Sequence, residues 1–371
     1  AYEIVSRDWS SDVCSSDLDR GSEEGRRVVP SEPELAGLDW SMGSRSIAII
    51  DWDAAMAVGR RVAGRGPATT PAQRDALRAD LRELVPLAES LVVELTGMRV
   101  EGFRARPWVL SRADWMAANV RGFQRMLDPL AERLAGEAPW SDLRRRAAGW
   151  QFGALLGYAS RKVLGQYDAF LPADDDGLLY FVGPNVVETE ARFFLPRRDF
   201  RLWIALHEVT HRVQFGATPW LRAHLKDLID RYVASMDPDP ARLAARIRSA
   251  IDDVRAGRVQ PGPILATMLM SEEQQDLFQR MQGIMMLLEG HASYAMNEAA
   301  RGRIADVDHL RRTLERRRRV GGLERAFQRA SGFAAKVEQY SSGERFVRAV
   351  VERVGMEGFN AVWAAPTNLP L

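Results

Sequence analysis

The sequence contains very little cysteine, with a single Cys14 among its 371 residues. One cysteine permits neither an internal disulfide nor a zinc site built from cysteine ligands. Long apolar runs are also missing: no stretch approaches the roughly 18 residues of a membrane helix. The first residues likewise lack a basic segment followed by an apolar one, the pattern of a secretion signal. We therefore expect a protein of the reducing cytoplasm that neither spans a membrane nor is exported.

Charge of one sign is not in excess either. The 51 Lys and Arg residues balance 50 Asp and Glu residues, which leaves a formal net charge of +1. No overall field then attracts nucleic acid or an anionic membrane. The densest basic run, residues 311–319, contains Leu314 and the acidic Glu315 but no aromatic residue, and no known nucleic-acid motif accompanies it. This pattern is typical of a solvated helix face, so we expect no nucleic-acid partner.

The segment over residues 1–46 is rich in Ser, Asp, Glu, Gly and Arg without sustained periodicity, which predicts disorder. Within it, SRDWSSDVCSSDL resembles a translated sequencing-adaptor fragment, so the segment is left out of the fold prediction. We expect residues 47–371 to form one domain, because a chain of this length can bury a sizeable core. Its two halves would be a helical half, 47–170, and a half that carries the metal motif described below, 171–371.

Apolar periodicity predicts a mainly α fold of the α+β class, with one small sheet. The predicted helices cover residues 47–62, 72–95, 111–134, 141–164, 200–215, 220–236, 241–254 and 271–300. Pro86 is expected to kink or split the second of them. Extended segments are predicted over 100–110 and 178–182. Residues 165–168 are predicted to end the helix over 141–164, and residues 183–185 are predicted to form a turn.

The run LLYFV, residues 178–182, is the strongest strand signal in the sequence. It precedes the predicted helix over 200–215 by about twenty residues. One interpretation is a sheet edge along which a substrate backbone binds by strand addition. The other is an ordinary buried strand without contact to substrate. A short apolar run does not distinguish between these two interpretations.

The helix predicted over residues 200–215, FRLWIALHEVTHRVQF, carries the motif that points to a chemistry. His207 and His211 are four residues apart, so they share one helix face and can reach a single metal ion. Glu208 flanks that face, where it could take a proton from a water activated by the metal, as in zinc hydrolases. The helix carries apolar residues on nearly every face, so it is expected to be buried. Histidines in a buried helix are costly unless they are paired or bound to metal. The pattern predicts a Zn²⁺ site, the alternative being two core histidines bonded to backbone carbonyls.

A catalytic zinc usually has three protein ligands, so a third remains to be found. Metzincins place a third histidine six residues beyond the second, but that position is Ala217, which excludes this class. His224 lies past the helix break at Gly216 and Pro219 and is predicted to be a surface helix residue.

The segment LLEGHASYAMNE, residues 287–298, contains better candidates. Glu289 and His291 are two residues apart and point to nearly opposite sides of a helix, so both cannot bind one ion. We choose Glu289 as the third ligand, which gives a Glu-zincin type of site. His291 then supports the site through another residue, donates to an oxyanion, or is simply a core histidine. Glu298 is the alternative ligand, because its Asn-Glu-Ala context echoes some Glu-zincins.

Glu-zincins also carry an acidic residue four positions after the third ligand. Here that position is Ser293 after Glu289 and Gly302 after Glu298. The Glu-zincin pattern therefore does not identify the group that orients the first histidine, His207.

Four segments together resemble one family: GYASRKVLGQYD, LLYFVGPNV, DFRLWIALHEVTHRVQFGATPWL and LLEGHASYAM. The sequence from about residue 47 onward is similar to bacterial zincin-like hydrolases, which are also described as zinc-dependent metalloproteases or as proteins associated with deazaflavin-coenzyme biosynthesis. The resemblance implies a mainly helical fold with a small sheet beside the HExxH helix. It also implies zinc bound by His207 and His211, with Glu208 as base and Glu289 as third ligand. It implies no particular substrate.

The first hypothesis is a zinc-dependent hydrolase, foremost a metallopeptidase acting on a peptide or protein, with Glu208 as general base and His291 as a further catalytic candidate. A second is a non-catalytic regulatory or protein-binding module that zinc stabilises. A third is a zinc amidohydrolase with a non-peptide substrate, which would use the same residues as the first.

Overall fold

The computed structural model describes residues 49–100, 105–135, 141–169, 178–235, 248, 270–318 and 333–370. The disorder predicted over 1–46 lies outside these residues, and so does the helix predicted over 241–254, apart from Arg248. Among the described residues, no helix combines the length and apolar character needed to cross a membrane.

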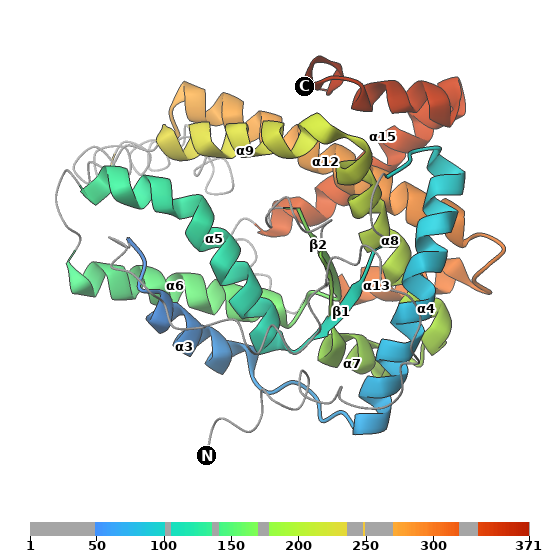
Figure 1. Ribbon diagram of the computed structural model, residues 1–371, viewed down its shortest axis with the longest axis horizontal. Coiled ribbons are helices and arrows are strands. Elements are labelled where there is room, and N and C mark those ends of the chain that lie inside the picture. Colours follow the sequence, from blue (N-terminus) through green and yellow to red (C-terminus); the bar gives the residue numbers. More distant parts are fainter. Residues whose placement is uncertain are drawn as a thin grey trace, which may run out of the picture. The chain divides into compact units, whose positions relative to one another are not determined.

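The chain is mainly helical with one small sheet, as the sequence predicts (Figure 1). Its α-helices are α3 (Trp52–Ala63), α4 (Pro71–Thr96), α5 (Arg112–Ala135), α6 (Asp142–Ser160), α7 (Gly183–Phe193), α8 (Arg197–Ala217), α9 (Pro219–Ala234), α12 (Glu272–Ala300), α13 (Val307–Arg318) and α15 (Phe333–Asn360). The strands are β1 (Pro107–Leu110), β2 (Gly165–Asp168) and β3 (Leu178–Val182), and two short 3₁₀ helices, η1 (Ala361–Trp363) and η2 (Pro366–Asn368), follow α15.

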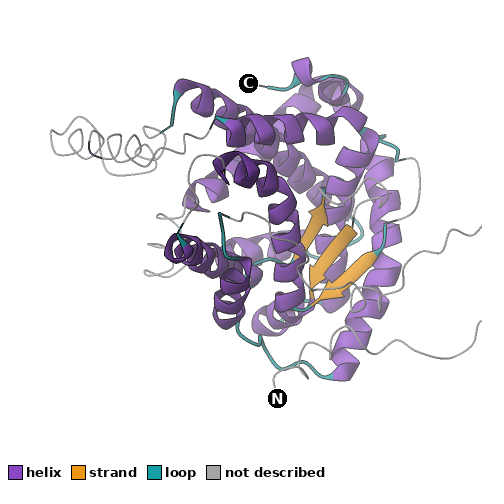
Figure 2. Ribbon diagram, turned by 60° about the vertical axis from the view of Figure 1, so that its left-hand side comes forward, coloured by secondary structure: helices purple, strands orange, loops and turns teal. Residues whose placement is uncertain are grey.

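The sheet has the order β1-β3-β2, so β3 is its central strand (Figure 2). β3 confirms the strand predicted over residues 178–182. Because β3 is hydrogen-bonded on both sides, the interpretation of LLYFV as an edge for strand addition was wrong. Its Leu179 and Phe181 are fully buried, as expected for an ordinary core strand. The edge strand that contacts α8 is β2.

Several helix ends follow from local signals in the sequence. Ser141 caps α6 by accepting from the Arg144 backbone N–H at 3.4 Å. At the start of α12, Ser271 and Gln274 form the predicted capping box, in which each side chain bonds to the backbone N–H of the other residue. Pro219 occupies the first turn of α9, where its missing N–H costs nothing.

The turn predicted over residues 183–185 was wrong, because these residues begin α7. Residues 165–168, predicted only to end the preceding helix, form β2. The reason for the helix at 183–185 is tertiary: the buried Asn185 amide donates to the carbonyls of Ser160 and Val163 at 2.7 and 2.6 Å and accepts from Arg112 Nε at 2.7 Å. These bonds replace the local ones that make Asn common in turns.

Two further helices differ from prediction in extent. α4 runs through Pro86 as one helix, so the proline does not split it. α6 ends at Ser160, four residues before the predicted end.

The chain divides into two compact units. The first comprises Ala1–Leu77, Trp108–Leu164 and Tyr180–Glu188. In it α3 and α6 lie side by side (Figure 1). A Cβ at position 153 of α6 would lie 2.1 Å from the Ala55 carbonyl oxygen, so Gly153 is required for this close approach. The prediction of one domain over 47–371, with halves 47–170 and 171–371, stays a prediction.

The second unit comprises Arg78–Pro107, Gly165–Leu179 and Thr189–Leu371. In it α12 packs against α8, α9 and α15, and α8 also contacts β2. All the residues of the candidate site belong to this unit.

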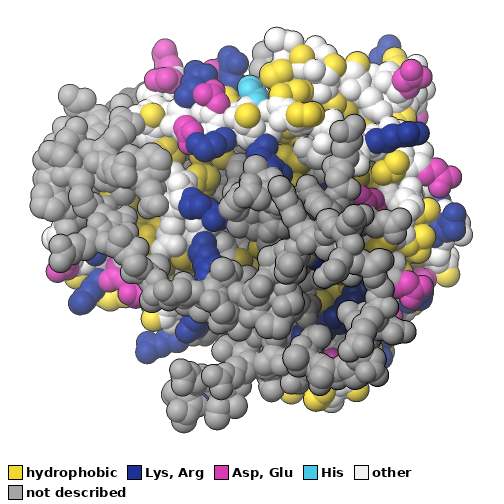
Figure 3. Space-filling model, viewed as in Figure 1, with side chains coloured by type: hydrophobic (Ala, Val, Ile, Leu, Met, Phe, Trp, Pro, Cys, Tyr) yellow, Lys and Arg dark blue, Asp and Glu magenta, His cyan; other side chains and the backbone are white. Residues whose placement is uncertain are grey.

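Charged side chains of both signs are interspersed over the part of the described surface that Figure 3 shows. Arg311 and Arg312 on α13 are exposed, in agreement with a solvated helix face.

Candidate metal centre

Helix α8 is buried on almost every side. Thirteen of its residues are buried, among them Leu206, Val209 and Val213 on different faces. His207 and His211 are the partly exposed positions in the middle of the helix, with 21% and 13% of their side chains accessible. The helix therefore presents the two histidines from an otherwise packed surface.

Two buried arginines of α8 have acidic partners, as burial of a charge requires. Arg201 bonds Glu190 Oε1 at 2.7 Å and Asp80 Oδ2 at 2.8 Å. Arg212 pairs with Glu89, which lies on α4. These ion pairs hold both ends of α8 and leave the two histidines as the groups that need explanation.

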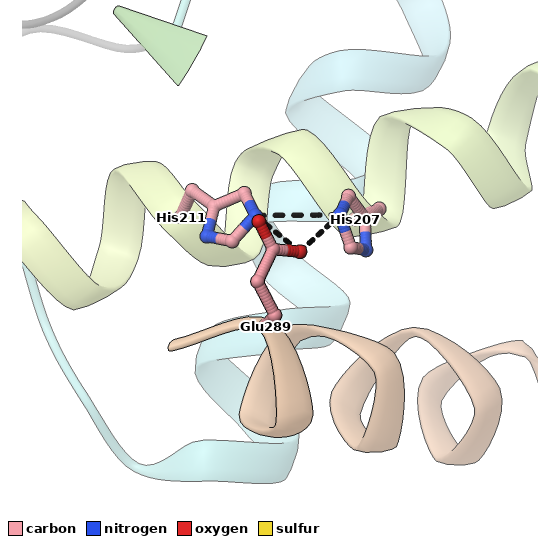
Figure 4. Close-up of side chains that lie close together, drawn as sticks. All are labelled: His207, His211 and Glu289. Carbon is pink, nitrogen blue, oxygen red and sulfur yellow. Dashed lines mark hydrogen bonds and ion pairs between the residues drawn. The ribbon is translucent and has the colours of Figure 1, made fainter. Parts of the chain in front are cut away.

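His207, His211 and Glu289 come together in the structure (Figure 4). The two histidines project from α8, and Glu289 projects towards them from α12. Glu289 Oε2 lies 3.5 Å from His207 Nε2 and 3.7 Å from His211 Nε2, and the two Nε2 atoms are 3.3 Å apart. One ligand atom from each residue thus lies within 4.8 Å of the others.

Charges within this cluster shift the pKa values of two groups. Burial by itself would raise the pKa of Glu289, but His211 and His207 outweigh it and hold that pKa well below its usual range. Burial would lower the pKa of His211, yet the Glu289 carboxylate raises it to about 9. The metal-free cluster is therefore an ion pair, and a metal that binds His211 must displace a proton.

Glu208 is buried beside the cluster, with only 6% of its surface exposed. Its carboxyl lies against the first residue of β2: a Cβ at Gly165 would be 2.6 Å from Glu208 Cγ and 2.7 Å from Oε1. The backbone of Tyr167, two residues along β2, donates a hydrogen bond to Glu208. Burial raises the pKa of Glu208, opposed in part by His207 and His211. The strand thus fixes where this carboxyl can be.

His291 is fully buried on α12 and does not belong to the cluster. Its Nδ1 lies 3.0 Å from Gln214 Nε2, and its ring stacks on Phe359 and tilts against Trp363. Gln214 Oε1 in turn lies 2.9 Å from His211 Nδ1. Burial, with the nearby His211, lowers the pKa of His291 to about 3, so its imidazole is neutral.

The other ligand candidates lie elsewhere. Glu298, the alternative third ligand, pairs with Arg348 at 2.8 Å and with Arg301 at 3.1 Å and lies outside the cluster. Its Asn-Glu-Ala context is a local likeness, whereas these ion pairs hold its carboxylate. His224 is partly exposed on α9 and meets the Trp220 ring edge-on, outside the cluster.

The sequence interpretation missed Gln214, Gly165 and Tyr167. Gln214 could have been found, because it lies three residues after His211 and therefore on a neighbouring position of the same helix face. For Gly165 and Tyr167 no local signal exists, since their importance comes from the pairing of β2 beside α8.

Comparisons with known proteins agree with this geometry. The sequence pattern of the zincin-like metallopeptidase family matches residues 50–371. The structure is similar to that of a protein from Chloroflexus aurantiacus described as "a putative hydrolase with a novel fold", with a TM-score of 0.64 and 29% sequence identity. The similarity covers 86% of this chain and 93% of that one. No protein of curated function matches the chain.

Proposed function

The chain belongs to the zincin-like metallopeptidase family, and from this premise we propose that it is a zinc-dependent hydrolase that cleaves peptide bonds. His207, His211 and Glu289 would hold the zinc, and Glu208 would act as the general base. The observation that carries the proposal is a two-histidine, one-carboxylate cluster with a buried, unliganded glutamate beside it.

The spacing of the cluster fits zinc. Ligand atoms about 2.0–2.1 Å from a tetrahedral zinc lie about 3.3 Å from one another. The three separations here, 3.3, 3.5 and 3.7 Å, are close to that value. Two imidazoles and one carboxylate are also the donor set of several catalytic zinc sites, which keep one position for water or substrate. The partial exposure of all three side chains supports access to that position.

When bound, zinc lowers the pKa of water and polarises a carbonyl group, which makes hydrolysis possible near neutral pH. The chain's own part is proton transfer. Glu208 accepts the proton of the attacking water and passes it to the leaving amine. Its burial favours this role, because a carboxyl whose pKa is raised takes up a proton more readily near neutral pH.

The test is Glu208→Gln, measured by zinc content and by mass-spectrometric digestion of an unbiased peptide library. We expect one zinc per chain to remain and peptide turnover to fall by about 10²–10⁴-fold, because the amide cannot accept the proton. Glu357→Gln, at an exposed position of α15, is the matched control and should be unchanged. Equal turnover by Glu208→Gln and the native protein would contradict the mechanism. Zinc bound to a native protein that cleaves no peptide would favour hydrolysis of a non-peptide amide.

A further inference from the structure

We propose that Gln214 and His291 form a neutral relay that locks His211 in the tautomer and orientation needed to bind metal. The proposal rests on the zinc site proposed above, but not on the reaction at that site. Gln214 belongs to α8 and His291 to α12, so the relay connects the two helices that carry the ligands.

The backbone carbonyl of Leu288 decides which way the Gln214 amide points. Gln214 Nε2 lies 2.8 Å from the Leu288 oxygen, and that oxygen can only accept. A reversed amide would place two oxygens at this distance, so Oε1 must face His211. Its distance of 2.9 Å to His211 Nδ1 then requires that Nδ1 carries the proton. The Nε2 lone pair of His211 is thereby left for the metal, on the side where His207 and Glu289 lie.

His291 completes the relay by accepting from the second hydrogen of the same amide. Because its Nδ1 accepts from Gln214, its own proton lies on Nε2. Within the described residues this buried Nε2 has no hydrogen-bond partner. An unsatisfied buried donor is unfavourable, and an apolar residue packed against Phe359 and Trp363 would avoid it. The acceptor that His291 offers to Gln214 accounts for a histidine at this position.

The relay differs from the usual arrangement, in which a carboxylate or backbone carbonyl accepts from the metal-ligating histidine. An amide orients the imidazole without adding a negative charge. Glu289 therefore stays the one charged group among the ligands and this partner, so a divalent cation would keep more of its positive charge than beside a second carboxylate.

The test compares zinc affinity, measured by chelator competition on the full chain, with a spectroscopic signature of the relay. In the zinc-loaded, ¹⁵N-histidine-labelled protein, the proton on Nδ1 of His211 should exchange slowly with water. Gln214→Met removes the acceptor at nearly equal volume. It should weaken zinc binding by about 10–100-fold and abolish the slowly exchanging signal. His291→Phe keeps the stacking on Phe359 and removes only the support of Gln214. It should therefore reduce zinc affinity and the slowly exchanging His211 signal less than Gln214→Met does.

Gln214→Glu is the conservative variant, because it keeps an acceptor for His211 while losing the donor to Leu288. Gln214→Glu should retain the slowly exchanging His211 signal, so it separates loss of the acceptor from a general loss of packing. It also tests the relay if Gln214→Met does not fold. His224→Gln, outside the cluster, should change neither measurement. Unchanged zinc affinity and exchange in Gln214→Met, or loss of the signal in Gln214→Glu, would overturn the relay. A native chain that binds no zinc would instead refute the proposed metal site itself.

A second inference comes from an independent observation, an arginine without an acidic partner near Glu208. Arg222 on α9 is half-buried, and its Nη2 donates to the Tyr167 hydroxyl at 3.2 Å. Its Nε is buried without a hydrogen-bond partner, and no carboxylate within the described part of the chain pairs with it. We infer that Arg222 and the Tyr167 hydroxyl form a subsite for a substrate carboxylate. This inference rests on the proposed hydrolase function.

The position of the pair supports this use. The Tyr167 backbone bonds Glu208, and the Tyr167 ring packs on Phe215 with ring centroids 5.6 Å apart. Phe215 follows His211 by four residues, so it lies on the same face of α8 about 6 Å further along. A carboxylate at Arg222 would then belong to a substrate residue close to the bond that is cut. Guanidinium is suited to it, because its parallel N–H groups match the two carboxylate oxygens.

Paired peptide libraries test this subsite in the zinc-loaded protein. In the first pair, one library has free C-termini and the other has amidated C-termini. In the second pair, one library contains Asp and Glu and the other contains Asn and Gln at the same positions. The first pair tests recognition of a terminal carboxylate, and the second tests recognition of a side-chain carboxylate. The native protein should prefer one carboxylate-bearing set. Arg222→Gln should raise the KM for that set by about 10-fold with little change in kcat, whereas Arg231→Gln, at an exposed position paired with Asp227, should not. Identical preferences in native protein and Arg222→Gln would overturn the subsite.

If the native protein cleaves no peptide, the peptidase proposal fails and binding decides the subsite. Binding of an acetylated dipeptide and its amide is then measured by calorimetry. Tighter binding of the acid that Arg222→Gln abolishes would support the subsite, and equal binding of acid and amide would refute it.

Discussion

Glu208 has room for its carboxyl because the neighbouring residue of β2 has no side chain. Replacing Gly165 with Ala introduces a Cβ that would lie 2.6–2.8 Å from Glu208 Cγ, Oε1 and Cδ. The backbone at Gly165 does not have a positive φ, so alanine is conformationally permitted there. We expect Gly165→Ala to keep its fold and zinc but to lose about 10²-fold in peptide turnover, because a base displaced by about 1 Å loses its alignment.

The measurement is steady-state turnover beside zinc content and circular dichroism. Gly122→Ala is the control, because a Cβ at Gly122 in α5 would meet nothing within 4 Å. Full turnover in Gly165→Ala would show that Glu208 is not confined by β2.

The ion pair between His211 and Glu289 makes the stability of the metal-free protein depend on pH. Folding raises the pKa of His211 from 6.5 to about 9, so its contribution is complete below about 6.5 and is lost as the pH rises through 9. Folding lowers the pKa of Glu289 from 4.5, so its contribution is present above that value and is lost as the pH falls. We expect Glu289→Gln to lower the free energy of unfolding of the metal-free protein most between about pH 4.5 and 6.5, by about 3 kcal/mol.

Urea unfolding in the presence of a chelator, from pH 5 to 10, measures this difference. The destabilisation by Glu289→Gln should shrink steadily above pH 7 and nearly vanish by pH 10. A difference that does not vary with pH would mean that the two side chains do not form an ion pair in the metal-free protein.

At the scale of elements, α12 is held against α15 by a contact between two glycines. A Cβ at Gly290, next to Glu289 of the cluster, would lie 2.4 Å from the backbone carbon of Gly343. Backbone cannot move aside as a flexible side chain can, so alanine here must push the helices apart. We expect Gly290→Ala to lower the free energy of unfolding by about 1–3 kcal/mol. Gly122→Ala should instead stabilise by up to about 1 kcal/mol, because alanine is the better helix former. Denaturant unfolding of both variants measures this, and an unchanged midpoint in Gly290→Ala would refute the close packing.

At the scale of the whole molecule, a zinc ligated from both α8 and α12 should stabilise the folded chain. Free zinc at about 100 times its dissociation constant adds about 2.7 kcal/mol to the free energy of unfolding. We expect a chelator to lower the unfolding midpoint, zinc to restore it, and His211→Ala to show no response to either. Thermal unfolding followed by circular dichroism measures these changes, and a midpoint that is insensitive to zinc would count against the site.

The sequence predicts well those features that depend on neighbours along the chain. The spacing of His207 and His211 within an apolar run identifies the buried helix, and Ser271 with Gln274 identifies the start of α12. Glu289 is predictable because a carboxylate in an apolar run is costly to bury unless it has a charged partner or a metal. Features that depend on distant partners are not predictable in this way. Asn185 begins a helix because remote carbonyls bind its amide.

The distance along the chain between the ligands bears on how the protein is made. His207 and Glu289 are separated by about 80 residues, although their side chains meet. During synthesis at 5–20 residues per second, a nascent chain displays two histidines for roughly 4–16 s before α12 supplies the carboxylate. The three-residue cluster can therefore form only after α12 has been made, and a chain that stalls before α12 has the two histidines without Glu289.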